Sequence, residues 1–338
     1  MKKTLLASAM AAIVLPVTAI ADVSIYGRAH VSLDYLDDGA DYGAANVSSN
    51  ASRLGFKAQT ELADITAFVQ IEQEINMAQG GGSNWASRDT FVGVKGDNWG
   101  MVRVGQFDSP FKAARGPANL FGDQVGDMRN LTRVGDGRFD ERLPNTVHFQ
   151  TPRFNGVQFN LGYSVHDGAD NSDDGKEDAY SVSATYQQGI VDGALAFESH
   201  NKNKSRGERQ GIRLALGLKV ADPIKLVAFY QNIDHKADDT LDSDTYGLGG
   251  EVKAAENTAL KAMYMHRKGE ASKDKADMIA VGVEHKISSP LRVYANYAVV
   301  LNDQDSNLTP WNQARTTGVD GVNDKDASGI SLGLRYDF

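Results

Sequence analysis

Apolar and polar residues alternate along most of the chain. The alternation is most regular in residues 23–35, 157–166, 212–220, 291–299 and 330–338. Successive side chains of a β-strand point to opposite faces, so a period of two predicts strands with one apolar face and one polar face. The pattern therefore favours an all-β chain.

A second group of segments shows the same period less regularly, and the faces of residues 88–96 and 224–234 are the least clear. The other members of this group are residues 52–60, 64–75, 101–107, 145–151, 179–187, 190–200, 244–253, 258–267 and 277–287. Together the two groups predict about sixteen strands.

The connections between these segments alternate in length. One set is short and turn-like, and within it Asn155-Gly156 is a signal for a type I′ hairpin. The other set is long, polar and rich in Gly, Asp, Asn and Ser. It comprises residues 37–51, 76–87, 108–143, 167–178, 201–208, 235–243, 268–276 and 301–327. Short turns at one end and long loops at the other are typical of an outer-membrane β-barrel.

The polar face carries charged residues on many strands, including Arg28, Arg53, Glu72, Arg213 and Arg335. Isolated charges are too costly to bury in an apolar core, so this face should be wet. Barrels of roughly 16–18 strands enclose an aqueous channel, and the apolar face would then contact lipid. Because an open sheet edge cannot be satisfied inside a bilayer, the barrel must close. We expect an antiparallel transmembrane β-barrel.

Residues 108–143 form a connection too long for an ordinary loop, and they show no sustained period. Aromatic and aliphatic residues recur among its charges at Phe111, Phe121, Leu131 and Phe139. Because disordered segments are poor in such residues, we expect an ordered insert that folds onto a concave surface.

Near its start the chain has Lys2 and Lys3, then an apolar run that ends in Ala19-Ile20-Ala21, which has small residues at its first and third positions. This arrangement predicts a secretory signal peptide over residues 1–21, with a retained N-terminal anchor as the alternative, and a single barrel domain over residues 22–338. Loss of Lys2 and Lys3 with the leader would move the formal net charge from −9 to −11. The chain has no cysteine, which excludes thiol chemistry, and its acidic balance argues against nucleic acid as a partner.

Six short motifs occur in a fixed order along the chain. They are Ile25-Tyr26-Gly27-Arg28, Ser52-Arg53-Leu54-Gly55-Phe56-Lys57, Arg88-Asp89-Thr90-Phe91-Val92-Gly93-Val94-Lys95-Gly96, Val102-Arg103-Val104-Gly105, Arg142-Leu143-Pro144-Asn145-Thr146-Val147 and Tyr336-Asp337-Phe338. In this order and spacing they resemble the general (non-specific) porins of Gram-negative outer membranes, over nearly all of the chain after the leader.

The resemblance implies a homotrimer in the outer membrane, in which each subunit is a barrel of roughly 16 antiparallel strands. Residues 108–143 would be its third extracellular loop, folded inward as a constriction. The terminal Phe338 would belong to the signal that the barrel-assembly machinery reads.

In such a constriction, basic side chains on the barrel wall face carboxylates on the loop. The resemblance places the basic residues at Arg28, Arg53, Arg88 and Arg133. Enteric members carry an acid where this chain has Leu120, so Asp123 and Asp127 are expected to supply the acidic side. Opposed charges in a narrow lumen would set ion preference. Ordinary surface ion pairs are the alternative interpretation.

Other chemistries find little support. Residues 170–175 resemble the start of a calcium-binding loop, but Ser181 stands where its final Glu should be. Ser164 and His166 share a strand face, yet no acid or oxyanion donor accompanies them. The histidines lack metal-type spacing, and there is no Walker-type loop or dinucleotide fingerprint. We expect no enzyme activity, no cofactor and no metal.

The sequence thus predicts a passive, water-filled channel for small hydrophilic solutes and ions. A solute-specific channel with a binding site at the constriction is the alternative, followed by a barrel enzyme or a surface adhesin. The acidic loops favour cations at the mouth, whereas the arginines favour anions at the narrowest point. Because charges inside a constriction are screened less than exposed ones, the prediction leans to anions or to little preference.

Overall fold

The computed structural model describes residues 22–82, 84–165, 178–202, 204, 206–270, 274–313, 315–316 and 318–338. The expected leader (residues 1–21), the calcium-loop-like stretch at 170–175 and His166 lie outside the described residues. Within the described ranges, no helix is both long and apolar enough to cross a membrane.

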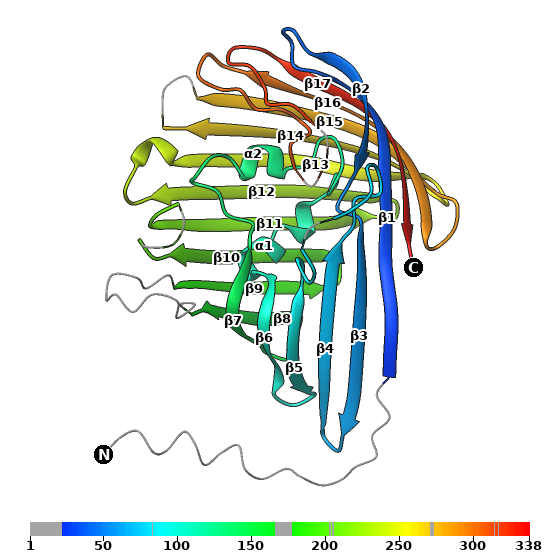
Figure 1. Cartoon of the computed structure of the whole chain (residues 1–338), viewed down its shortest axis with the longest axis vertical. Coiled ribbons are helices and arrows are strands. Elements are labelled where there is room, and N and C mark those ends of the chain that lie inside the picture. The colour runs from blue at the N-terminus through cyan, green and yellow to red at the C-terminus, as the bar shows by residue number, and fades with distance from the viewer. Residues whose placement is uncertain are drawn as a thin grey trace.

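Seventeen strand segments make up most of this part of the chain (Figure 1). The strands are β1 (Asp22–Asp37), β2 (Gly43–Ser49), β3 (Arg53–Leu62), β4 (Ile65–Glu74), β5 (Thr90–Gly96), β6 (Gly100–Asp108), β7 (Arg142–Gln150), β8 (Val157–Ser164), β9 (Ala179–Gln188), β10 (Val191–His200), β11 (Arg209–Ala221), β12 (Ile224–His235), β13 (Ser243–Ala255), β14 (Thr258–Gly269), β15 (Lys275–Lys286), β16 (Leu291–Asn302) and β17 (Ala327–Asp337). The short helices are α1 (Pro110–Ala113), η1 (Gly116–Ala118), α2 (Arg129–Thr132) and η2 (Asp239–Leu241).

The strands close into one antiparallel barrel. From β3 to β17 each strand pairs with the next along the chain, and β17 pairs with β1. The segments β2 and β3 both pair with β1, over different parts of its length, so they act as one interrupted strand. The seventeen segments therefore form a sixteen-stranded barrel, which confirms the fold predicted from the sequence.

The first long connection is shorter than predicted. The sequence pattern predicts a loop over residues 37–51, but the structure forms β2 within it and leaves only residues 38–42 between two strands. Ala45 and Val47 of β2 lie opposite the outward-facing residues of β1. The small side chains on this face weaken the alternation, which is why the pattern missed the strand.

The wall of the barrel separates apolar from polar side chains. Its outer face exposes large apolar residues along every part of the circumference, such as Leu33, Leu161, Leu214, Leu248 and Leu332. The inner face carries the charged residues of the alternating pattern. An apolar outer band is the surface that a membrane-spanning barrel presents to lipid.

The turns follow the predicted asymmetry. At the turn between β7 and β8, Asn155 and Gly156 have φ angles of +46° and +84°. Two successive positive φ angles define the type I′ geometry, which confirms this hairpin. The long connections lie at the opposite ends of the strands.

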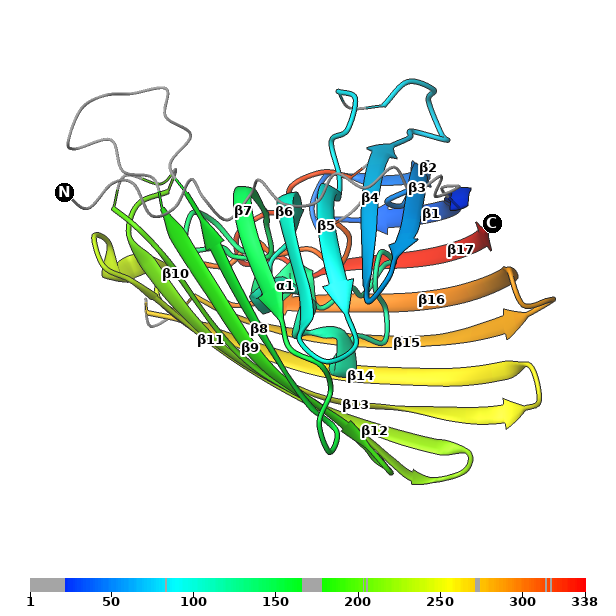
Figure 2. The same ribbon diagram turned by 90° about the horizontal axis from the view of Figure 1, so that it is seen from below.

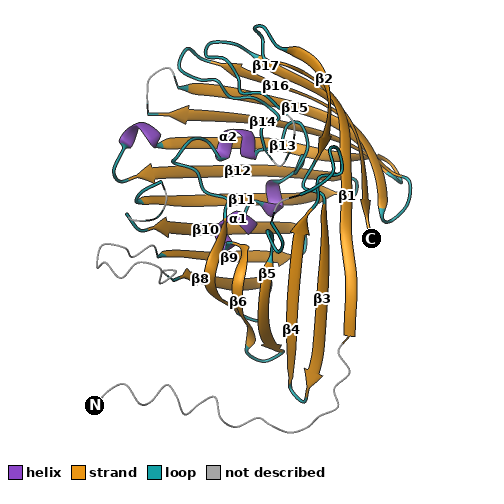
Figure 3. Ribbon diagram, viewed as in Figure 1, coloured by secondary structure: helices purple, strands orange, loops and turns teal. Residues whose placement is uncertain are grey.

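Residues 108–143, which we term the inner segment, join β6 to β7 and cross to the far wall (Figure 2; Figure 3). Within this segment, α1 contacts β8, β9 and β10, η1 contacts β10, β11 and β12, and α2 contacts β14. Glycines on the inner face make room for it. A Cβ added to Gly217 would lie 2.9 Å from the Pro117 carbonyl oxygen, and one on Gly282 would lie 3.0 Å from the ring of Phe121.

The apolar residues that recur in the inner segment anchor it. Phe111 and Phe139 are fully buried, and Phe121 and Leu131 are 1% exposed. These side chains pack among alanines, valines and methionines of the inner face. The segment is therefore ordered, as its composition predicted.

Residues 303–326, which we term the last long segment, hold the inner segment from its other side. The amide of Gly126 donates to the carbonyl of Pro310 at 2.8 Å. Arg315 forms an ion pair with Asp34, which is buried on the inner face of β1. The inner segment is thus supported by the far wall and by a second connection.

Candidate functional site

Three of the predicted wall arginines lie close together. Arg28 on β1 and Arg53 on β3 are direct cross-strand partners, so their side chains leave the wall side by side. Arg88 precedes β5, and its Nε lies 2.6 Å from Glu72 Oε1. The other oxygen of Glu72 lies 3.8 Å from Arg53 Nε. One carboxylate therefore links two of the three arginines.

Asp123 is the carboxylate of the inner segment that meets this arginine group. Its Oδ2 lies 3.2 Å from Arg28 Nη1, and its Oδ1 lies 2.8 Å from Arg129 Nη2. Asp127 is fully buried, accepts the backbone amide of Asp123 at 2.7 Å and holds Arg129 at 2.5 Å. The structure thus places Asp123 against the wall, with Asp127 behind it as a support.

The electrostatic surroundings keep Asp123 ionised. Burial alone would raise the pKa of this carboxyl, but the guanidinium groups of Arg129, Arg28 and Arg53 outweigh burial and hold the pKa below its usual value. The Arg28–Asp123 contact therefore persists at neutral and mildly acidic pH.

The structure brings Arg133 to a different place. Its Nη1 donates to Gln313 Oε1 of the last long segment at 3.1 Å, and its Nη2 lies 3.9 Å from Glu141. This residue joins the inner segment to the last long segment, whereas Arg28, Arg53 and Arg88 form one group on the wall.

The terminal residue takes part in the seam of the barrel. The amide of Gly27 donates to the carbonyl of Phe338 at 2.8 Å, and the amide of Phe338 donates back at 3.1 Å. The Phe338 ring stacks on Tyr336 with centroids 5.9 Å apart. A Cβ on Gly27 would lie 2.4 Å from this ring, so glycine is required where the last residue meets β1.

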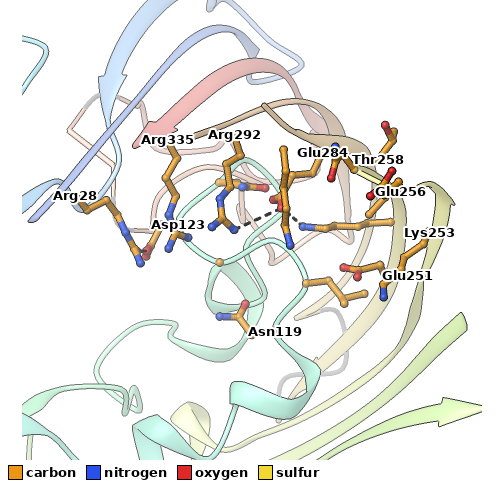
Figure 4. Close-up of a pocket in the computed structure, with 17 residues that line it drawn as sticks. Arg28, Asn119, Asp123, Glu251, Lys253, Glu256, Thr258, Glu284, Arg292 and Arg335 are labelled. Carbon is orange, nitrogen blue, oxygen red and sulfur yellow. Dashed lines mark hydrogen bonds and ion pairs between the residues drawn. The ribbon is translucent and has the colours of Figure 1, made fainter. Parts of the chain in front are cut away.

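Two polar cavities share Arg28. The first has a volume of about 410 Å³, and its charged lining residues are Arg28, Arg53, Lys57, Glu72, Asp89, Asp108, Arg142 and Asp337. The second, which we term the basin, has a volume of about 480 Å³ and lies between residues 119–124 of the inner segment and strands β13 to β17 (Figure 4). The basin includes Glu256 and Asn257 of a short turn. It is therefore on the short-turn side of the inner segment.

Sequence reasoning missed several charged residues around the basin. Asp337 accepts hydrogen bonds from Arg28 Nε at 2.8 Å and from Arg335 Nε at 2.9 Å. Glu284 lies 3.0 Å from the Nζ of Lys261. The period of two assigns Arg335 to the polar face, and the same period could have assigned Asp337 and Glu284 to that face. Which of these residues become neighbours depends on the register between strands, and the period of two does not determine that register.

The arrangement can act on solutes through charge alone. Within the described residues, no three or more His, Cys, Asp or Glu side chains are grouped for a metal ion. Opposed carboxylates and guanidinium groups in a water-filled lumen orient polar solutes and select ions. The site is therefore suited to the passage of polar solutes and ions.

A closed sixteen-stranded barrel with an apolar exterior and a charged interior defines an outer-membrane β-barrel of the pore-forming class. The profile of the family described as Gram-negative porin matches residues 6–305. The chain belongs to this family, and it is an outer-membrane protein.

Relatives by sequence include two proteins named major outer membrane protein P.IB from Neisseria meningitidis serogroup B. One is 28% identical over 316 residues, which cover 85% of this chain and 90% of the relative. The other is 30% identical over 213 residues, which cover 60% of this chain and 61% of the relative. The chain thus matches about three fifths of the length of that second relative.

Two solved structures share the fold. An anion-selective porin from Comamonas acidovorans superposes with a TM-score of 0.81 at 20% identity, over 94% of this chain and all of that chain. The trimer form of OmpT, an outer membrane protein of Vibrio cholerae, gives a TM-score of 0.69 at 18% identity, over 94% of this chain and 99% of that chain.

Proposed function

We propose that the protein is a passive diffusion channel of the outer membrane, through which small hydrophilic solutes and ions follow their gradients. The observation that carries this proposal is the charged inner face, whose cavities of about 410 and 480 Å³ share Arg28. Charges of both signs on an inner wall require water around them. Passive flux needs neither energy coupling nor a chemical step, so the proposed protein is not an enzyme.

Within this channel the inner segment would set the size limit. Asp123 supplies the acidic pole of the constriction, and Arg28 and Arg53 supply the basic pole. Arg88 supports the basic pole through Glu72. The two remaining residues expected at the constriction have indirect roles: Asp127 positions Asp123 through Arg129, and Arg133 joins the inner segment to the last long segment.

The charge balance supports little ion preference or a mild preference for anions. Six basic and four acidic side chains line the basin, whereas the adjoining cavity has four of each sign. The porin of similar fold from Comamonas acidovorans is described as anion-selective, which agrees in direction.

The proposal includes a homotrimer embedded in outer-membrane lipid. The trimer form of the Vibrio cholerae protein supports this assembly, as does the shared fold. Phe338, at the end of the last strand, would serve as the assembly signal for the barrel machinery. A solute-specific channel is the second candidate function, and the surplus of cations in the basin favours it.

The experiment that tests the channel is single-channel recording of the purified protein in a planar bilayer under a salt gradient. We expect ohmic current in steps grouped by three, with a reversal potential near zero or displaced toward anions. Replacing Arg28 and Arg53 by Gln should move the reversal potential toward cations. Lys225, which lines neither of the two cavities, serves as the matched control in a Lys225→Gln variant.

Folded protein that inserts and carries no current would overturn the channel proposal. A reversal potential that the Arg28 and Arg53 replacements leave unchanged would remove these two residues from the constriction while the channel itself stands.

A further inference from the structure

Arginines face one another across two strand pairs of the inner wall. Arg53 lies directly opposite Arg28, and Arg292 lies directly opposite Arg335. Asp337, opposite Arg28, separates the two pairs. Like charges directly across a strand pair destabilise a sheet. This row of arginines therefore destabilises the fold, so a contribution to stability does not explain why these positions are arginine.

The arginines of this row share too few carboxylates. Asp337 lies 2.8 Å from Arg28 Nε, 2.9 Å from Arg335 Nε and 3.6 Å from Arg292 Nη2. Three guanidinium groups thus compete for one carboxylate, which can balance only one of them.

Carboxylates are also fewer than cations on the neighbouring strands β14 to β16. Lys261 Nζ lies 3.0 Å from Glu284, and Arg292 Nη1 lies 3.5 Å from the other oxygen of that residue. Asp123 contacts both Arg28 and Arg129, and Arg129 is also paired with Asp127 at 2.5 Å, so the charge of Asp123 is available to Arg28. The four wall cations of β1, β14, β16 and β17 therefore have two wall carboxylates and Asp123 between them, which leaves a surplus of one positive charge.

Donors of this group remain free. Arg335 donates hydrogen bonds to Asp337 through Nε, and its two Nη nitrogens have no hydrogen-bond partner among the described residues. The Nε of Arg292 is buried and likewise unpartnered in this part of the chain. Buried or confined donors without acceptors are costly, and a planar fork of free N–H groups fits the oxygens of a phosphate.

The free donors border a space of suitable size. Arg28, Arg335 and Arg292 lie in a row along one side of the basin, which has a volume of about 480 Å³ (Figure 4). Glu251, Lys253 and Glu256 lie on the opposite side. The arginine side has the higher density of positive charge, so an anion entering the basin would be drawn to it.

We propose that the basin is a binding subsite for a small phosphoryl dianion, either inorganic phosphate or a phosphate monoester, held between Arg335 and Arg292. This inference rests on the proposed channel, because the ligand must reach the basin through the lumen. Six basic and four acidic side chains line the basin, so two negative charges match the surplus of two positive charges in its lining. The protein would then concentrate such anions on the short-turn side of the constriction, and their flux would saturate.

The test is block of chloride current through single channels at constant ionic strength. Inorganic phosphate is added on either side in one series, and glycerol phosphate, a phosphate monoester, in another, both at a pH where the dianion predominates. We expect wild-type chloride current to fall to a plateau as either probe is raised. Loss of charge-assisted hydrogen bonds should raise the half-blocking concentration about tenfold or more in Arg335→Gln and in Arg292→Gln. Arg335→Lys keeps the charge but loses the fork, and it should give an intermediate value.

Lys225→Gln is the matched control. Its chloride current should be blocked by both probes at the same concentrations as the wild-type current. If the probes block all variants equally, or do not block wild-type channels that conduct chloride, the subsite proposal is overturned and the channel proposal stands. If only the ester blocks, the ligand is an organic phosphate. If both block alike, the phosphoryl group alone is recognised. Absence of chloride current without any probe would instead contradict the channel itself.

Discussion

At the scale of single residues, buried ion pairs fix the inner segment to the far wall. Asp140 Oδ1 lies 2.5 Å from Arg213 Nη1, and both side chains are fully buried. The same Arg213 nitrogen donates to the carbonyl of Phe111 at 2.8 Å. Removing one partner of a buried pair leaves an uncompensated charge and costs about 3–5 kcal/mol. This pair is therefore a sensitive point of the fold.

Asp140→Asn should lower the free energy of unfolding by about 3–5 kcal/mol, because Arg213 would be left charged and buried. Thermal unfolding followed by circular dichroism measures this loss. Asp136→Asn is the control, because the Asp136 side chain is 71% exposed. Equal stability of the two variants would contradict the assignment.

The same pair sets a pH dependence. Burial would raise the pKa of Asp140, but Arg213 and Arg115 outweigh it and lower the pKa below the usual carboxyl value. A lowered pKa stabilises the fold at any pH above the usual value, and this contribution is lost as the pH falls through the lowered one. Wild type should therefore keep its stability at mildly acidic pH, and the difference between wild type and Asp140→Asn should shrink only in stronger acid.

Lys112 should make ion preference change with pH near neutrality. Burial lowers its pKa to about 8 despite the opposing charge of Asp108, whose Oδ1 lies 2.8 Å from the ammonium. Above that pH, Lys112 becomes neutral, and Asp108 keeps its ion pair with Arg142 at 3.2 Å. The reversal potential should shift toward cations as the pH rises through about 8. Lys112→Arg stays charged and should abolish the shift, whereas a shift of the same size in that variant would assign it to another group.

At the scale of elements, two connections brace each other inside the barrel. Trp311 of the last long segment is fully buried, and its indole donates to the carbonyl of Val319 at 2.9 Å. The backbone N–H of Gln313 donates to Asn130 Oδ1 of the inner segment at 3.1 Å. The position of the inner segment therefore depends on a segment that lies far from it in the sequence.

Arg315→Ala should loosen this brace, because it leaves the buried Asp34 without its ion-pair partner. We expect larger and noisier single-channel currents, since the inner segment keeps the far wall but loses part of its second support. Lys325→Ala, at an exposed position of the same segment, is the control. Currents of wild-type size and noise in Arg315→Ala would show that the last long segment does not position the inner segment.

The elements also show what the sequence could and could not predict. The period of two identified nearly all strands and placed Arg335 on the polar face, because alternation is a local property. It missed β2, whose outer face has small side chains. It could not show that Arg335 faces Arg292, because sliding a strand by two residues keeps both faces and changes every neighbour. Nor could it show that Arg133 contacts the last long segment, because the path of the inner segment is set by packing on glycines of distant strands.

At the scale of the whole molecule, charge differs between the mouth and the lumen. Exposed carboxylates gather in the long connections, at Asp41, Asp303, Asp305, Asp320 and Asp324. The basin at the other side of the inner segment has an excess of basic residues. A permeating ion therefore meets fields of opposite sign in succession.

Ion preference should change with salt concentration. Fields from exposed charges extend about 30 Å at 0.01 M salt but only about 3 Å at 1 M, whereas charges inside the lumen are screened less. We expect a shift toward cations in dilute salt, where the mouth dominates, and toward anions in concentrated salt. Reversal potentials at a fixed concentration ratio and increasing mean concentration measure this. A permeability ratio independent of concentration would contradict it.

The barrel closes where β1 pairs with β17, so closure requires both ends of the described chain. Arg28 and Asp337, which meet there, are 309 residues apart, so nearly the whole chain must be in place before the ring can shut. A barrel that lacks its last strand would keep two unpaired edges, and a bilayer does not tolerate such edges. A chain that lacks its last strand therefore cannot close its barrel in a bilayer, and closure is completed where Phe338 pairs with Gly27.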